Sequence, residues 1–585
     1  MKSTSTTAWF ICSMLFITSP TYSIANELNN IIPEKKIIVV VPSYNNPIEF
    51  TRDCLQSILM QKYSNFEILF CDDCSPQPNI EYIHRTLIAE LDMHNKITYV
   101  RNHQRYGPIG NQWHAFHSIN PDNIEDNREI IVITVDGDDV LLHPNILTKV
   151  NEMHQHSWLT YGQYIFYPPS QITDFQAGKV SDTVIAANAW RQVWGFPTGH
   201  LRTYRLSLLK DLPLDTFLYK GIFYPAAGDA PLMYSLCEKA SFHTCFNPEP
   251  LYGYRITDQN ELRSGMAQQA IECYQNARNQ TPFPPLQELP NQLPLNHYQT
   301  DLIIFSYKRP MQLYALLESV EKYITGLQRI VVLYRADDEN YEQAYYEVKT
   351  HFQNVVFVRQ SVTHPHLDFK PLLLQILYTS ASEYLIFATD DDIVKDYIEI
   401  NDCVRALQKT HAYGFYLRLG KNLTHSYIAN CIQSIPNLVD VDKNIYALQI
   451  DPKAYDVFYD WAYPNTVDMT LYPKETITHA LHWLNYNSPT SLEASWAKLS
   501  LEESTKIGLC FEQSKMVNIP LNRVQTINSS NFPLISIHRF MEDNTEKLCE
   551  LFKAGFKIDL QPLHQWNNKS SHAEWEFKFI PRSDN

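Results

Sequence analysis

The chain has 585 residues, of which 44% are apolar and 19% are charged, with 36 Tyr and 28 Phe. A single hydrophobic core stops growing near ~250–300 residues, so two or three globular domains are expected and a disordered chain is excluded. The 48 Lys and Arg against 64 Asp and Glu give a net charge of −16. Because this charge repels phosphate backbones, nucleic acid is excluded as a partner.

The first 25 residues have the layout of a secretory leader. Lys2 precedes an apolar run from Ala8 to Thr18, and the small-x-small sequence Ser23-Ile24-Ala25 follows. The run is short for a membrane span. Residues 1–25 are therefore predicted to be a signal peptide, which implies export, or a short uncleaved anchor, which implies membrane association. Membrane contact is expected through this N-terminus only.

The next segment predicts a parallel sheet. Residues 37–42 and 67–71 are short, apolar and rich in β-formers, and residues 48–62 between them carry apolar side chains at helical spacing. Strand, helix and strand within about 30 residues are typical of a βαβ unit. Further strands are predicted at 97–100 and 129–135. Ligands of such sheets bind beyond the carboxyl ends of the strands, so the residues that follow each strand are candidates for a site.

Acidic residues follow two of these strands. Asp136-Gly137-Asp138-Asp139 comes after the strand at 129–135, and Asp72-Asp73 ends the strand at 67–71. Adjacent carboxylates repel one another unless a cation lies between them. Oxygen ligands suit Mg²⁺ or Mn²⁺, and the open coordination positions suit a diphosphate. A solvated acidic turn is the alternative, and the second Asp pair disfavours it.

The second half of the chain repeats this arrangement. A strand at 302–305, a helix at 310–323 and a strand at 330–333 form another βαβ start, and a third strand leads into Asp390-Asp391-Asp392. The loop Ser306-Tyr-Lys-Arg-Pro310 matches Ser43-Tyr-Asn-Asn-Pro47. A duplicated domain is predicted, with Asp136 and Asp390 at equivalent strand ends.

The boundary between the halves is predicted in residues 282–294, which hold five prolines and favour an extended spacer. The predicted fold class is α/β, with two Rossmann-like domains on mostly parallel sheets in tandem. The predicted order is the leader, a first domain at 34–265, a helix and linker at 266–297, and a second domain at 298–585.

The N-terminal motifs resemble the core of family 2 glycosyltransferases of GT-A fold. The likeness covers about residues 36–260 and includes VPSYNN, EILFCDDCSPQ and IVITVDGDDVLLHPNIL. The resemblance implies a nucleoside site at Pro42, Ser43, Tyr44, Asp72 and Asp73. It also implies a metal and diphosphate site at Asp136, Asp138 and Asp139, and a catalytic base at Asp229. The sequence departs from the family pattern at Cys74, Gly110 and Gly228.

The second half resembles GT-A enzymes more loosely. There the resemblance implies a metal site at Asp390 and Asp392, a diphosphate contact at Lys370 and a base at Glu493. For Glu493 the alternative is a carboxylate in the first turn of a helix, where the helix dipole favours negative charge.

The expected reaction moves a sugar from a nucleotide-sugar donor to an acceptor hydroxyl, with Mn²⁺ or Mg²⁺ at the diphosphate. The resemblance implies inversion, a hexosyl or N-acetylhexosaminyl donor, and a glycan, lipid-linked or protein acceptor. Two metal motifs on two sheets raise the hypothesis of a bifunctional enzyme.

Three other functions were weighed against this one. A GT-A-fold nucleotidyltransferase needs a loop rich in glycine and basic residues after its first strand, and residues 43–47 have neither. A glycosidase needs two carboxylates on either side of the sugar and has no use for a nucleoside-binding Asp pair. A non-catalytic carbohydrate-binding or scaffold role for one or both domains stays open because of the departures from the family pattern.

Overall fold

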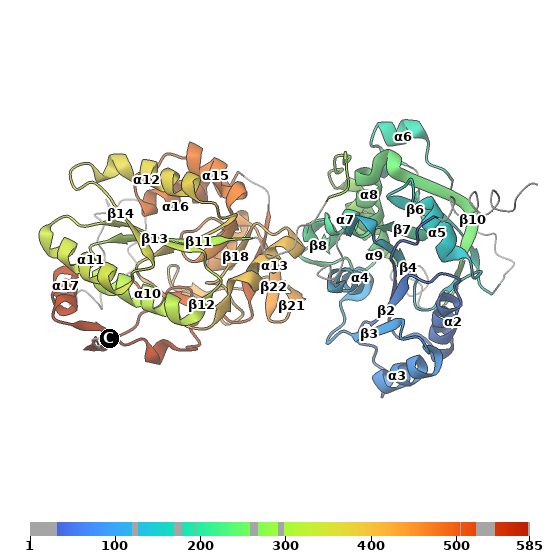
Figure 1. Ribbon diagram of the computed structural model, residues 1–585, viewed down its shortest axis with the longest axis horizontal. Coiled ribbons are helices and arrows are strands. Elements are labelled where there is room, and N and C mark those ends of the chain that lie inside the picture. Colours follow the sequence, from blue (N-terminus) through green and yellow to red (C-terminus); the bar gives the residue numbers. More distant parts are fainter. Residues whose placement is uncertain are drawn as a thin grey trace, which may run out of the picture.

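The structure is a computed structural model of two lobes, the first drawn blue to green and the second yellow to red (Figure 1). The leader predicted at residues 1–25 lies outside the described part of the chain, as do residues 291–297 of the linker. The described residues are 32–119, 127–168, 178–193, 195–257, 267–290, 298–502, 505–521 and 544–582.

The N-terminal lobe is built on an eight-stranded sheet in the order β3-β2-β1-β4-β7-β6-β10-β5. Its first four strands in this order pair in parallel, β7 is antiparallel to both neighbours, and β6 pairs in parallel with β10. The strands are β1 (Ile37–Ser43), β2 (Phe66–Asp72), β3 (Ile97–Arg101), β4 (Ile131–Thr134), β5 (Val140–Leu141), β6 (Leu159–Phe166), β7 (Gly199–Arg205) and β10 (Thr244–Tyr254). The main helices are α2 (Ile48–Leu59), α3 (Ile80–Leu91), α4 (Gly107–Ser118), α5 (Ile146–Met153), α8 (Asp229–Ala240) and α9 (Ala267–Asn279).

The C-terminal lobe is built on a nine-stranded sheet in the order β14-β13-β11-β15-β23-β18-β24-β22-β21. The strands are β11 (Thr300–Tyr307), β13 (Arg329–Arg335), β14 (Val355–Arg359), β15 (Tyr384–Thr389), β18 (Gly414–Tyr416), β21 (Leu438–Asp442), β22 (Ile445–Ile450), β23 (Thr470–Pro473) and β24 (Lys506–Phe511). The main helices are α10 (Pro310–Tyr323), α11 (Glu339–His351), α12 (Pro365–Thr379), α13 (Ile400–Thr410), α15 (Lys474–Trp483), α16 (Pro489–Ser500) and α17 (Thr545–Lys553).

The two sheets correspond strand by strand when β1 is matched to β11. The strand β15 takes the place of β4, β23 that of β7, β18 that of β6 and β24 that of β10, with the same parallel and antiparallel pairings. The predicted α/β class is confirmed, with a mostly parallel sheet in the N-terminal lobe. The predicted helix at 310–323 coincides with α10.

Hydrogen bonds between the first and fourth strands fix which residues stand level in the two lobes. The Gly137 amide donates to the Pro42 carbonyl at 2.9 Å, and the Asp390 amide donates to the Phe305 carbonyl at 3.1 Å. Pro42 and Phe305 are themselves level, because each comes directly before the serine that starts the corresponding loop. Asp390 therefore takes the position of Gly137.

Asp136 and Asp390 follow equivalent strands, β4 and β15, as predicted. At the level of single residues, the strand register places Asp390 one residue further on than Asp136. By this register, Thr389, Asp390, Asp391 and Asp392 correspond in order to Asp136, Gly137, Asp138 and Asp139.

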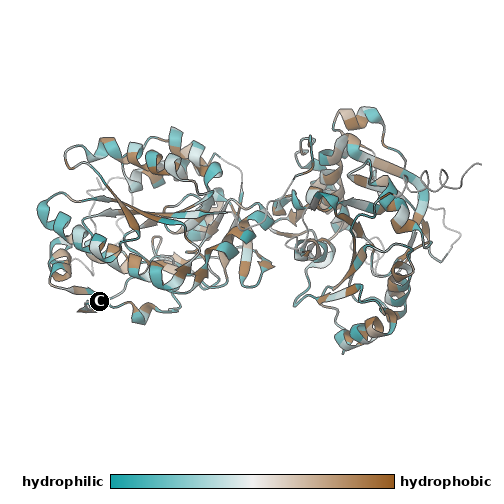
Figure 2. Cartoon of the chain, viewed as in Figure 1, coloured by the Kyte–Doolittle hydropathy of each residue, from teal (hydrophilic) through white to brown (hydrophobic). Residues whose placement is uncertain are grey.

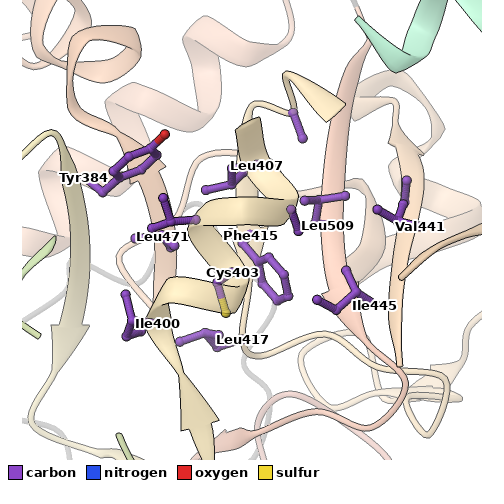
Figure 3. Close-up of a cluster of buried hydrophobic side chains, with 14 of the residues drawn as sticks. Tyr384, Ile400, Cys403, Leu407, Phe415, Leu417, Val441, Ile445, Leu471 and Leu509 are labelled. Atoms are coloured by element: carbon purple, nitrogen blue, oxygen red, sulfur yellow. The ribbon is translucent and has the colours of Figure 1, made fainter. Parts of the chain in front are cut away.

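Apolar side chains between the sheets and their helices form the cores of both lobes. Figure 2 shows many brown stretches along the strands and many teal ones along the outer helices. In the C-terminal lobe, Cys403 and Leu407 of α13 lie in one buried cluster with Phe415 of β18 and Leu471 of β23 (Figure 3). Each fully buried side chain of this size stabilises the fold by ~1.5–3 kcal/mol, so α13 is held firmly on the sheet.

The lobes meet through polar contacts beside α13 and β22. The His411 Nε2 lies 3.2 Å from the Lys210 carbonyl oxygen, and the Gln449 amide donates to Asp215 Oδ1 at 3.2 Å. A cavity of about 650 Å³ lies between the lobes and is lined on the N-terminal side by Tyr106 and neighbouring residues. Within the described residues, no helix has the length and apolar character needed to span a bilayer.

Candidate active site

The loop after β1 lies at the carboxyl end of the N-terminal sheet, where a ligand is expected. The loop turns at Asn45, whose φ of 56° is in the left-handed region that asparagine tolerates. The Asn45 amide donates to Ser75 Oγ at 2.8 Å, and the Asn46 side chain donates to Ser43 Oγ at 3.3 Å. The Arg105 guanidinium lies 3.9 Å from the centre of the Tyr44 ring. The predicted nucleoside residues of this loop therefore adjoin the strand end of β2.

The Asp pair at the end of β2 is buried and fully engaged with the neighbouring loops. Asp72 accepts hydrogen bonds from the Ser75 amide at 3.2 Å and from Arg101 Nε at 2.9 Å. Asp73 accepts three at 2.9 Å, from the Asn102 side chain and from the amides of Tyr106 and Gly107. Burial raises the pKa of Asp73 although these donors lower it. The pair thus positions the segment that leads into α4.

The motif Asp136-Gly137-Asp138-Asp139 lies at the end of β4, directly beside the first loop. Asp136 and Asp138 are partly exposed, whereas Asp139 is buried and accepts a hydrogen bond from the Arg255 amide at 2.6 Å. Burial raises the pKa of Asp139 well above its usual range, and the charges of Asp136 and Asp138 raise it further. Burial also raises the pKa of Asp138. The two partly exposed carboxylates of Asp136 and Asp138 therefore lie at the strand end, next to the buried Asp139.

Gly137 is required by the close approach of the first loop. A Cβ atom at this position would lie 2.9 Å from Ser43 Cβ and 3.0 Å from both Asn46 Nδ2 and the Pro42 carbonyl oxygen. Such distances are shorter than ordinary van der Waals contact, so a side chain here would push the loop away from the aspartates. Because glycine has no side chain, the two predicted binding segments can pack closely against each other.

The predicted divalent cation can be tested against these residues. Across the described part of the chain, no group of three or more His, Cys, Asp or Glu side chains is arranged to hold a metal ion. A Mg²⁺ ion that also binds substrate phosphates needs only one or two protein carboxylates. Asp136 and Asp138 supply hard oxygen ligands, and their repulsion toward Asp139 would be relieved by a cation. These residues fit an ion that is shared with a phosphate ligand.

Asp229, the predicted base, is the first residue of α8. Its Oδ2 lies 3.0 Å from a terminal nitrogen of Arg202, and its side chain is 42% exposed, compared with 12% for Arg202. The Arg202 guanidinium also lies 5.1 Å from the centre of the Phe196 ring. The carboxylate is thus oriented by a buried arginine while it stays accessible to a ligand.

Three residues around the motif had no assigned role in the sequence-based prediction. The Tyr252 hydroxyl accepts a hydrogen bond from the Asp136 amide at 3.1 Å, and its ring stacks on His200 with 4.5 Å between centroids. Burial lowers the pKa of His200 well below its usual range, so the stacked ring is neutral. Arg255 binds Asp53 at 2.9 Å. These partners lie too far apart in sequence for the contacts to be inferred from it.

An arginine of the same lobe pairs with two carboxylates of the C-terminal Asp triplet. One nitrogen of Arg309 lies 2.9 Å from Asp390 Oδ1 and 3.1 Å from Asp391 Oδ2. Asp392 is fully buried and accepts hydrogen bonds from the Thr389 amide at 3.0 Å and from Asn518 Nδ2 at 2.9 Å. This arrangement does not fit the predicted metal site at Asp390 and Asp392, because Arg309 already pairs with Asp390 and the oxygens of the buried Asp392 already accept hydrogen bonds from the chain.

The predicted diphosphate contact Lys370 has a different local role. Its ammonium donates to the Leu484 carbonyl at 2.6 Å and lies 5.2 Å from the centre of the Tyr486 ring. Both partners lie in the connection between α15 and α16. This contact assigns Lys370 to the packing of that connection.

Glu493, the predicted second base, lies in an acidic cluster. It is the fifth residue of α16 and therefore stands beyond the first turn, where the helix dipole acts most strongly. Its Oε1 accepts a hydrogen bond from the Val467 amide at 3.2 Å. Burial, and then the charge of Asp468, raise the pKa of Glu493 to about 7. Asp468 Oδ2 in turn lies 3.5 Å from His572 Nε2, so three titratable groups meet here.

The N-terminal lobe matches a known protein family. Residues 38–212 match the family described as glycosyl transferase family 2. The matched range includes Asp72, Asp136 and Asp138 and ends before Asp229. The N-terminal part of the chain therefore carries a family 2 glycosyltransferase domain, and the predicted resemblance is confirmed.

Individual known proteins show more distant similarity. The bifunctional glycosyltransferase pgtA of Dictyostelium discoideum is 24% identical over 254 residues, which cover 39% of this chain and 32% of that protein. The match thus spans about a third of the length of this curated relative.

Two solved structures complete the comparison. The mannosyltransferase PcManGT of Pyrobaculum calidifontis, in complex with GDP-Man and Mn²⁺, is 16% identical, with 45% of this chain and 72% of that chain covered and a TM-score of 0.30. TarS 1–349 of S. aureus in complex with UDP is 17% identical, with 41% and 71% covered and a TM-score of 0.28.

Proposed function

We propose that this chain is a cation-dependent glycosyltransferase that moves a sugar from a nucleotide-sugar donor to an acceptor hydroxyl with inversion. The observation that carries the proposal is the family 2 match over residues 38–212, which contains the partly exposed carboxylates Asp136 and Asp138 at the carboxyl end of β4. A hexosyl or N-acetylhexosaminyl donor, a glycan, lipid-linked or protein acceptor, and export or membrane association through the N-terminus are further parts of the proposal.

The N-terminal site has a role for each part of the reaction. Ser43, Tyr44 and the loop held by Asp73 face the expected nucleoside position, and Asp136 and Asp138 would hold Mn²⁺ or Mg²⁺ with the diphosphate. The bound ion would stabilise the charge of the leaving nucleoside diphosphate. Asp229 accepts the proton of the acceptor hydroxyl while its oxygen bonds to the anomeric carbon and the bond to the diphosphate breaks.

The proposed stereochemistry follows from the number of bases. Asp229 is one accessible carboxylate, oriented by Arg202 at 3.0 Å. One base opposite one leaving group supports a single displacement, which inverts the anomeric centre. A retaining double displacement would need a nucleophilic carboxylate in contact with the sugar as well.

The test is turnover of a panel of nucleotide sugars by the full chain, with Mn²⁺ and with a chelator. We expect turnover of one donor with Mn²⁺, none in chelator, and recovery when Mn²⁺ is restored. The variant D138N should lose turnover, whereas D182N, which alters an exposed aspartate paired with Lys179 at 3.3 Å, should retain it. Full turnover in chelator would refute the cation dependence, and turnover of no donor would refute the transferase.

A further inference from the structure

The two lobes differ at one pair of facing positions beside the strand end. In the N-terminal lobe these positions hold Asn46 and Gly137. A Cβ atom added at Gly137 would lie 3.0 Å from Asn46 Nδ2. In the C-terminal lobe the matching positions hold Arg309 and Asp390, joined by an ion pair of 2.9 Å. A neutral, tightly packed pair in one lobe thus corresponds to a charged pair in the other.

Arg309 lies where a cation would otherwise be needed. Its single nitrogen contacts oxygen atoms of both Asp390 and Asp391, and its side chain is only 10% exposed. A guanidinium nitrogen that bridges two carboxylates supplies the positive charge that a divalent ion would supply between them. Because the guanidinium cannot lose its proton in proteins, this charge is permanent.

The remaining oxygens of the triplet are also occupied. Asp390 Oδ2 accepts a hydrogen bond from the Tyr307 amide at 3.1 Å, and Asp391 Oδ1 accepts one from Thr389 Oγ1 at 2.8 Å. Asn518 Nδ2 donates to Asp391 at 3.2 Å and to Asp392 at 2.9 Å. Hydrogen bonds and ion pairs from within the chain therefore hold these carboxylates in place.

The first carboxylate of the N-terminal motif has no counterpart here. By strand register, Thr389 takes the place of Asp136, and a threonine hydroxyl is a far weaker cation ligand than a carboxylate. The threonine thus removes one of the two carboxylates proposed to hold an ion in the N-terminal lobe, and Arg309 engages the counterpart of the other, Asp391.

We propose that the C-terminal strand end works without a divalent cation, with Arg309 as its built-in counter-charge. A ligand that binds there meets the guanidinium and the carboxylates directly, so its binding does not depend on Mn²⁺. This goes beyond the proposed transfer reaction, which concerns the N-terminal site. The chain then combines a cation-requiring strand end with a self-neutralised one on two sheets of matching strand order.

The test measures how Mn²⁺ alone binds to the full chain. The electron paramagnetic resonance signal of free Mn²⁺ reports how much of the ion remains unbound. The background variant D136N/D138N removes the N-terminal carboxylates, so any remaining saturable binding is at other sites. We expect no saturable binding in this background below about 1 mM, the weak end of protein sites for hard cations. Adding R309N, which installs the residue found at position 46, should create one Mn²⁺ site at least tenfold tighter than this limit.

Matched variants distinguish the effect of removing the positive charge at position 309 from the effect of disturbing the local structure. In the same background, R309K keeps a positive charge and should bind no Mn²⁺, and R335N removes an arginine that pairs with Asp337 at 2.6 Å and should also stay silent. Because an ion that binds only the native state raises the melting temperature, Mn²⁺ should stabilise the R309N variant and leave the background unchanged.

Two results would overturn the proposal. One is saturable Mn²⁺ binding in the D136N/D138N background that disappears on adding D390N/D391N. The other is an R309N variant that neither binds Mn²⁺ nor melts at a higher temperature with it. Because the N-terminal carboxylates are absent from every arm, these results are independent of whether the N-terminal domain transfers a sugar.

Discussion

The N-terminal and C-terminal strand ends have the same backbone frame but place different residues opposite their acidic motifs. In both, a loop after the first strand approaches an acidic motif after the fourth strand. The N-terminal loop presents the neutral Asn46 to Gly137, whereas the C-terminal loop presents Arg309 to Asp390. An acidic motif at a strand end therefore does not by itself identify a cation site. The residue that faces the motif also determines whether a cation can bind there.

The candidate bases differ in the same way. Asp229 is 42% exposed at the start of a helix and is oriented by Arg202. Glu493 is bonded to the Val467 amide within a cluster that also holds Asp468, and its pKa is raised to about 7. The N-terminal carboxylate is thus accessible from solvent, as the proposed base must be, whereas the C-terminal one has a pKa near neutral pH.

The largest expected effect separates these two carboxylates. The D229N variant keeps the size of the side chain but cannot accept a proton, so kcat for sugar transfer should fall by ~10²–10⁴-fold, the usual contribution of a general base. Donor binding, measured by calorimetry with Mn²⁺, should change little because Asp229 is not expected to touch the nucleotide.

The control is D211N, which alters the aspartate paired with Lys239 at 2.5 Å near the other end of α8. It should keep kcat close to that of the parent. If D229N also transferred sugar at the parental rate, another residue would have to be the base. The comparison of Asp229 with Glu493 as candidate bases would then no longer hold.

The next effect concerns stability and its dependence on pH. Burial raises the pKa of Glu493 from 4.5 to about 7, so between these values the native state holds a proton that the unfolded state has lost. The contribution of Glu493 to the free energy of unfolding should therefore fall as the pH rises from about 4.5 to about 7, by up to ~3 kcal/mol, and change no further above that.

Denaturant unfolding of the C-terminal lobe at several pH values measures this slope. The E493Q variant stays neutral at every pH and should lose the contribution, whereas E475Q, at an exposed position of α15, should keep it. Equal slopes for the parent and E493Q would mean that Glu493 is ionised in the native state throughout this range.

Much of the fold could be predicted from the sequence, because apolar runs and helical spacing report local structure. The strand predicted at 37–42 is β1, and the helix predicted at 310–323 has the same bounds as α10. The position of Asp390 could not be predicted in this way, because register depends on which amide meets which carbonyl on a neighbouring strand. The sequence predicts only that Asp390 and Asp136 lie at equivalent strand ends, and the hydrogen bond to Phe305 places Asp390 level with Gly137.

The site shows the same limit. That Ser43, Asp73 and Asp138 lie near one another could be predicted, because they stand at or just beyond strand ends that a parallel sheet brings together. The contact of Lys370 with the Leu484 carbonyl could not be predicted, because the two lie 114 residues apart in sequence. The pairing of Arg309 with Asp390, 81 residues apart, could not be inferred either. Side-chain partners of this kind depend on tertiary packing, which leaves no local pattern.

The smallest expected effect tests the packed pair of the N-terminal lobe. In the variant G137A, the new Cβ atom would lie 2.9 Å from Ser43 Cβ and 3.0 Å from Asn46 Nδ2 and the Pro42 carbonyl oxygen. The loop must shift to make room, which should lower the free energy of unfolding of the N-terminal lobe by ~1–3 kcal/mol. The matched control is G178A, whose added Cβ meets no atom within 4 Å and should change stability by less than ~0.5 kcal/mol. Denaturant unfolding of the three proteins measures the difference. If G137A were as stable as G178A, the loop would yield freely, and the close approach that distinguishes this strand end from its C-terminal counterpart would not be a constraint of the fold.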